Sequence, residues 1–126
     1  MAKVIHDDVF DAALAEVATC TRMVVFGPSG TAPADVAACA ASLAATALTA
    51  GDGNGDFAIA GGAVSGRKVT VAQQASLSVA TTGTATHIAL HDGTDLLLVT
   101  TCTNQLLTSG NTVTVPAFAF EITDPA

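Results

Sequence analysis

The chain contains neither Trp nor Tyr, and only 4% of its 126 residues are aromatic. Half of the residues are nevertheless hydrophobic, chiefly Ala, Val and Leu. Because large aromatic side chains dominate the energetics of binding hot spots, the sequence offers few anchors of that kind. Its length suffices for one hydrophobic core, and we predict a single domain over residues 1–126.

Basic residues are scarce as well. Lys and Arg total 4 against 11 Asp and Glu, and the formal net charge is −7. A nucleic-acid-binding protein needs a basic surface, since phosphate contacts supply much of its affinity. Adhesion to an anionic membrane has the same requirement. We therefore expect neither nucleic acid nor membrane among the partners.

Motifs of nucleophilic catalysis and of phosphate binding are missing. The segment GPSG at 27–30 lacks the GxSxG spacing of a nucleophile elbow, and no GKS or GKT follows it. The polar residues are mostly Ser and Thr scattered along predicted strands, where such side chains commonly face solvent. We predict a protein without enzymatic activity and without a cofactor.

Two patterns are candidates for metal binding. DGNGD at 52–56 begins like an EF-hand calcium loop, but Phe57 and Ala63 stand where that loop needs Gly and Glu, so we interpret it as a flexible turn. His87 and His91 would lie about 13 Å apart on a strand, too far for one ion. We expect His87 to hydrogen-bond a neighbouring strand and His91 to begin a turn, and we predict no metal site.

The three cysteines, Cys20, Cys39 and Cys102, show no CxxC spacing, which argues against a zinc site. An odd number leaves no complete disulfide framework. We expect reduced thiols that are buried as small hydrophobic side chains, with one disulfide and one free thiol as the alternative.

Apolar residues recur at helical spacing in two segments of the N-terminal half. The first predicted helix has a cap at Asp7 or Asp8, begins near Val9 and ends near Cys20. A short predicted strand follows at 22–26.

The second predicted helix begins at Pro33 and extends to about residue 50. Its apolar stripe consists of Val36, Cys39, Ala40, Leu43, Ala44, Ala47 and Leu48. Asp35 and the internal Ser and Thr residues favour a soluble Ala-rich helix over a membrane span. No apolar secretion signal is visible near the start, so we expect synthesis in the cytoplasm.

From residue 57 onward, apolar and polar residues alternate as they do in half-buried strands. The predicted strands are 57–60, 67–72, 76–81, 86–91, 96–101, 111–115 and 117–122. We predict an α+β fold that is mainly β, with an antiparallel sandwich or meander in the C-terminal two-thirds and one or two N-terminal helices packed on it. The predicted parts are an extended arm at 1–8, a helical part with one short strand at 9–50, a β part at 57–122 and a tail at 123–126.

Two features of the β part indicate contacts. Residues 96–99 are apolar at every position, and we expect them to be covered on both faces, by the N-terminal half or by another subunit. Arg67 and Lys68 form a basic pair. This pair either meets carboxylates such as Asp92, Asp95 or Glu121, in a partner or within the same fold, or lies on a solvated strand edge.

Four strings of the sequence resemble a family of short proteins of tailed phages and prophages. They are VIHDDVFDAAL at 4–14, SGRKVTV at 65–71, TGTATHIALHDG at 82–93, and LLLVTTCTNQLLTSGNTVTVPAFAFEITDPA at 96–126. The strings occur in the same order as in that family. The resemblance implies a structural part of the virion and brings no catalytic residues with it.

The role that the resemblance implies is a decoration or cement protein on the capsid exterior. It would bridge major capsid proteins and other virion subunits as a homo-oligomer, with a trimer as one option. A tail or baseplate module that binds a host is the alternative. A small hydrolase or sugar-binding domain, with a pocket of converging His, Asp and Ser groups, is a third. The candidate contact residues are Met1, Lys3, Val4, Ile5, His6, Arg67, Lys68, Thr123 and Pro125.

Overall fold

The computed structural model describes residues 5–27 and 33–124. The chain is α+β and mainly β, as predicted. The elements in order are α1 (Asp7–Val17), β1 (Arg22–Phe26), the 3-10 helix η1 (Ala38–Ala41), β2 (Ala44–Ala47), β3 (Phe57–Gly61), β4 (Arg67–Val71), β5 (Gln74–Ser78), β6 (Gly83–His91), β7 (Leu96–Leu107), β8 (Thr112–Val115) and β9 (Phe118–Ile122).

Helix α1 begins two residues before the predicted start and is capped by His6 rather than by an Asp. The His6 Nδ1 atom accepts a hydrogen bond from the Asp8 backbone N–H at 3.2 Å. Asp7 and Asp8 lie in the first turn, where a carboxylate interacts favourably with the positive end of the helix dipole. Phe10 and Leu14 are the buried residues of the helix and fix it to the β part.

The second predicted helix is wrong. In its place the chain forms only the four-residue η1 and then β2, which pairs antiparallel with β1. Ser42 has extended backbone angles and ends η1. Helix propensity alone is only weakly predictive of structure. Pairing of Ala44–Ala47 with β1 forms hydrogen bonds to backbone groups that a helix would otherwise satisfy, and it buries Leu43 and Ala44.

One layer is a four-stranded antiparallel sheet in the order β2-β1-β6-β7. Along β1, Met23 and Val25 face the main core, whereas Val24 and Phe26 face the opposite side. There they form a small outer core with Cys39 of η1 and with β6. This alternation is the period of two that the sequence predicts for strands.

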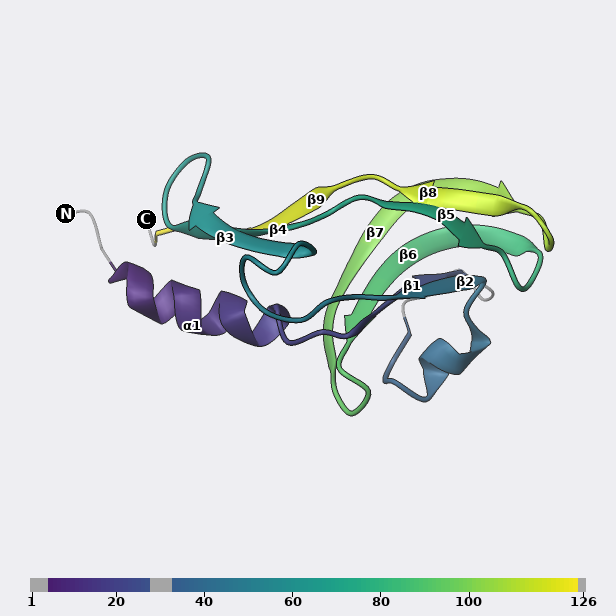
Figure 1. Cartoon of the computed structure of the whole chain (residues 1–126), viewed down its shortest axis with the longest axis horizontal. Helices are drawn as coiled ribbons and strands as arrows, with labels where there is room; N and C mark the ends of the chain where they lie inside the picture. Colours follow the sequence, from purple (N-terminus) through teal and green to yellow (C-terminus); the bar gives the residue numbers. More distant parts are fainter. Residues whose placement is uncertain (1–4, 28–32, 125–126) are drawn as a thin grey trace.

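The second layer is a long two-stranded ribbon that bends once (Figure 1). Strands β4 and β5 follow one another with two residues between them, and they pair with β9 and β8 respectively. Pro116 lies at the break between β8 and β9, where it has no backbone N–H to donate. Strand β3 adds to the outer edge of β4.

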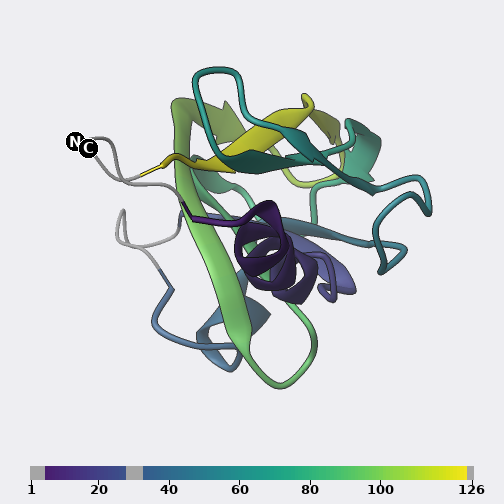
Figure 2. The same ribbon diagram turned by 90° about the vertical axis from the view of Figure 1, so that its left-hand side faces the viewer.

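The two layers close on one side and at one end. On one side, Ala44 of β2 forms an antiparallel bridge with Val79, just beyond β5, and the Ala80 N–H donates to the Leu43 carbonyl at 2.8 Å. At one end, α1 contacts β3, β4 and β7, as the view along the helix shows (Figure 2). Among the described residues, the opposite side has no pairing between β7 and β8 or β9.

Strand β7 is much longer than predicted and forms an edge of its sheet. The register with β6 shifts between Leu90 and His91, so Leu97 is an extra residue on β7. Leu97 and Leu98 therefore both pack on the main core, while Leu96 and Val99 pack on the outer core. Both faces are contacted, but each of the four side chains is only half-buried.

Candidate interaction surface

The unpaired side of the molecule carries a groove of about 480 Å³ between β7 and the β8–β9 edge. We call it the open groove. Its floor consists of the main-core residues Val25, Ala85, Ile88, Leu107 and Val115. Its rims consist of residues 100–103 and Gln105 on β7, and of Val113, Thr114, Pro116, Phe118 and Ala119 on the other edge.

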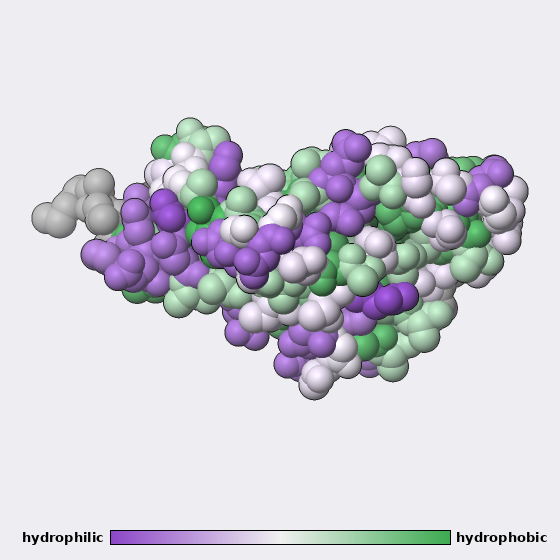
Figure 3. All heavy atoms as spheres, viewed as in Figure 1, coloured by the Kyte–Doolittle hydropathy of each residue, from purple (hydrophilic) through white to green (hydrophobic). Residues whose placement is uncertain are grey.

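The open groove lies in a stretch of chain without charge. Residues 96–120 contain no Asp, Glu, Lys, Arg or His. Proteins usually protect exposed strand edges with charged side chains, above all with Lys. The exposed side chains of Thr101, Thr103, Asn104 and Gln105 are polar but neutral, and the apolar Leu106 is 69% exposed. In the surface view, strongly hydrophilic residues are dense over α1 and sparser towards the β5–β8 end (Figure 3).

Local hydrogen bonds explain why β8 does not fold back onto β7. The connection between these strands bonds to the segment after β5 instead: the Val79 N–H donates to the Asn111 carbonyl at 2.9 Å, and the Gly110 N–H donates to the Val79 carbonyl at 3.0 Å. The Ser109 N–H donates to the Thr82 hydroxyl at 2.9 Å. Strand β8 is thereby directed to β5, and its other edge faces the open groove.

Each cysteine has a different environment, and none is paired with another. Cys102 is half-buried at the rim of the open groove, and burial raises the pKa of its thiol. Cys20 is fully buried, and burial together with the nearby carboxylates of Asp92 and Glu16 raises its pKa to about 12. Cys39 is buried in the outer core, where burial likewise raises its pKa.

The predicted basic pair is used within the chain. The Arg67 guanidinium donates to the carboxylate of Asp11 on α1 at 2.7 Å and 3.3 Å, with 24% of the Arg67 side chain exposed. This hydrogen bond raises the pKa of Arg67. Lys68 lies directly opposite Glu121 of β9. Because β4 is the central strand of its sheet, the interpretation as a strand edge is wrong.

The predicted contact residues of the two chain ends are described only in part. Met1, Lys3, Val4 and Pro125 lie outside the described residues. Ile5 is half-buried and His6 is the cap of α1. Thr123 is exposed, next to Asp124, whose N–H donates to the Ser65 hydroxyl at 3.0 Å.

The acidic loop at 52–56 forms a turn, and its carboxylates accept hydrogen bonds from neighbouring segments. One oxygen of Asp52 accepts from the Ile59 N–H at 2.9 Å. Asp56 accepts from the Thr49 N–H and from the Gln74 side-chain amide. Within residues 5–27 and 33–124, no three metal-ligating side chains gather.

The two histidines of β6 differ from each other. His87 bonds the Thr86 hydroxyl of its own strand at 2.8 Å, so the expected bond to a neighbouring strand is wrong. His91 ends β6 and precedes a turn, as predicted, and its Nδ1 atom accepts from the Gly93 N–H at 3.1 Å. Among the described residues that line the open groove, none is a His, Asp or Ser that could form a hydrolytic site.

Comparison of the chain with protein-family models, with curated proteins and with solved structures found no match. Among the helices that the structure describes, none combines the length and the apolar character needed to cross a bilayer. The open groove was not predicted from the sequence. The signal that could have indicated it is the absence of charge from residues 96–120.

Proposed function

We propose that the chain is a structural protein of a tailed-phage particle that binds the outside of the capsid shell as a decoration or cement protein. In this role it bridges major capsid proteins, and copies of the chain contact one another or other virion subunits. The proposal takes up the resemblance of the strings at 4–14, 65–71, 82–93 and 96–126 to short virion proteins.

The observation that carries the proposal is the open groove. The layers are joined through β2 and β5 on one side and covered by α1 at one end, yet main-core residues still form the floor of a groove on the other side. The rims are two strand edges with no partner among the described residues. A protein that works as a free monomer usually covers or charges such edges.

The mechanism follows from these edges. An extended segment of a neighbouring subunit forms main-chain hydrogen bonds to β7 or to β8–β9, and its apolar side chains cover the floor of the groove. Repulsion is small here because residues 96–120 are uncharged, although the chain as a whole carries −7. A protein that binds only the assembled shell stabilises that state by mass action.

Quantitative mass spectrometry of purified particles tests the proposal. We expect a copy number comparable to that of the major capsid protein, and loss of the chain from particles when Thr103→Lys places a charge at the rim of the open groove. Val64→Lys is the matched control, since Val64 is 85% exposed and far from residues 96–120 in sequence. A handful of copies per particle would exclude shell-wide cement and favour the tail or baseplate role. Absence from particles would contradict both roles.

A further inference from the structure

Arg22 forms no ion pair with any Asp or Glu side chain of the described residues. All 11 Asp and Glu residues of the chain lie within the described ranges, yet the ion pairs found there within 4.0 Å are Arg67 with Asp11 and His6 with Asp8. In a chain with a net charge of −7, an Arg that meets none of these carboxylates is unexpected. Arg22 opens β1 and is exposed.

His91 is the one polar residue buried among those that the structure describes, with 8% of its surface exposed. Its Nδ1 atom accepts the Gly93 N–H, so the ring proton lies on Nε2. None of the described groups bonds Nε2, and the described chain has no fully buried side-chain nitrogen or oxygen atom without a partner. The Nε2–H donor therefore retains contact with solvent space.

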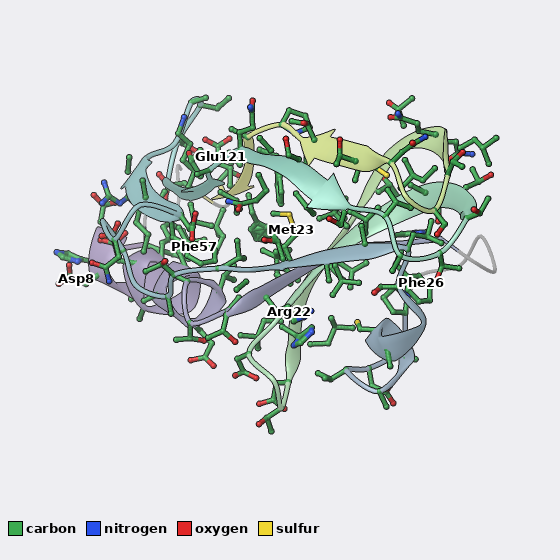
Figure 4. All side chains as sticks on the ribbon, turned by 45° about the vertical axis from the view of Figure 1, so that its right-hand side comes forward. Asp8, Arg22, Met23, Phe26, Phe57 and Glu121 are labelled. Carbon is green, nitrogen blue, oxygen red and sulfur yellow. The ribbon has the colours of Figure 1, made fainter. Side chains whose placement is uncertain are left out.

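Arg22 and His91 are brought together by strand register. They are directly opposed across β1 and β6, so their side chains share the outer face of the sheet. Both line a second pocket of about 270 Å³ beside η1, together with Ser42 and an apolar wall that includes Val24 and Val36. Figure 4 shows Arg22 projecting from β1 on the side of η1, opposite to Met23.

We propose that this pocket binds a monocarboxylate with a short apolar chain, or the side chain of an Asp or Glu presented by another protein. The Arg22 guanidinium offers the fork of donors that matches a carboxylate, and His91 and Ser42 offer further donors beside it. The apolar wall accommodates the carbon chain next to the carboxylate.

The surrounding charges favour a single negative charge over a phosphate dianion. Asp35 lies three residues before η1, and Asp92 directly follows the pocket residue His91 in sequence. Their carboxylates already accept backbone N–H groups, from Ala38 in the first case and from Thr94 and Asp95 in the second. Neither carboxylate neutralises Arg22, but both oppose a second negative charge in the ligand.

An NMR titration of the ¹⁵N-labelled full chain with sodium acetate, against sodium chloride at equal ionic strength, tests the pocket. We expect saturable shifts of the Arg22 side-chain and His91 ring nitrogens. Arg22→Gln should weaken acetate binding by at least about tenfold, since it removes the charge-assisted hydrogen bonds to the carboxylate. Arg22→Lys should retain part of the affinity, because it keeps the charge but loses the fork. Lys68→Gln, which also removes one positive charge, should leave the affinity unchanged.

Two further arms identify the source of the carboxylate. Shifts at the His91 ring nitrogens that grow with protein concentration, reverse with acetate and vanish in Arg22→Gln would place the carboxylate on a second copy. Saturation by acetate without such concentration dependence would place it on a different molecule. Shifts that do not saturate, equal shifts in Arg22→Gln, or tighter binding of inorganic phosphate than of acetate would each overturn the proposal.

Discussion

The end of the molecule under α1 and the side between β7 and β8–β9 are both built from apolar core residues. These residues are fully buried in the first region, whereas some of them remain only half-buried in the second. Under α1, Leu14, Phe57, Val69 and Val71 have 0–1% of their surface exposed, and the Arg67–Asp11 ion pair joins the helix to β4. At the open groove, the side chains of Phe118 and Val113 pack on the same core but remain half-buried. The difference is the covering element, since a helix lies over one region and none of the described elements lies over the other.

This comparison indicates which apolar surface the chain covers by itself and which it leaves for another chain to cover. At the end under α1, the apolar side chains are buried by elements of the chain itself. The open groove keeps an ordered floor and two unpaired strand edges, which are the features that strand addition by another chain requires. Substitutions in the first region should therefore act on folding, and substitutions at the second should act on assembly.

Phe57→Ala should have the largest effect on stability. Phe57 is 1% exposed in the main core under α1, so its truncation leaves a cavity and lowers the free energy of unfolding by about 3–5 kcal/mol. Urea denaturation followed by circular dichroism measures this loss. Val64→Ala, at a position 85% exposed, should change stability by less than about 0.5 kcal/mol. Equal losses in the two variants would show that the core does not lie where the structure places it.

Gly27→Ala should have an intermediate effect and shows how tightly the backbone is packed next to the open groove. A Cβ atom at Gly27 would lie 2.0 Å from the Thr84 carbonyl oxygen and 2.9 Å from the Thr86 nitrogen. Backbone atoms cannot rotate away, so we expect a loss of about 1–3 kcal/mol in unfolding free energy. Gly61→Ala is the control, because its Cβ would meet no atom within 4 Å. A neutral Gly27→Ala would mean that β1 and β6 separate easily at this point.

The rate at which iodoacetamide alkylates each cysteine should also differ between the open groove and the buried core. We expect this effect to be smaller than the two changes in stability. The thiolate is the reactive form, and burial raises the pKa of Cys102, so its rate at pH 8 should be below that of a free cysteine and still rise as the pH passes 9. Cys20, with a pKa of about 12 and no exposure, should remain unmodified in the folded chain. Peptide mass spectrometry over a pH series measures both rates. Faster modification of Cys20 than of Cys102 would reverse the assignment of buried and accessible regions.

The sequence was most informative where patterns are local. Alternation of apolar and polar residues located β3, β4, β6 and β9 to within a few residues. It failed for Ala44–Ala47, because Ala favours a helix by local propensity and the pairing with β1 overrides that preference. The pairing of Arg67 with Asp11 and the approach of Arg22 to His91 join residues far apart in sequence. Likewise, the open groove exists because particular edges stay unpaired, and strand order cannot be read from a single strand's pattern.

Hydrogen exchange of the purified chain and of the chain within particles, compared peptide by peptide, tests the central claim most directly. We predict that the amides of residues 101–107 and 113–119 that face the unpaired edges exchange quickly in the free chain and become protected in the particle, while those of β3 and β4 change little. Unchanged exchange in both rim segments, with new protection elsewhere, would contradict the assignment of the open groove as the surface that other subunits cover.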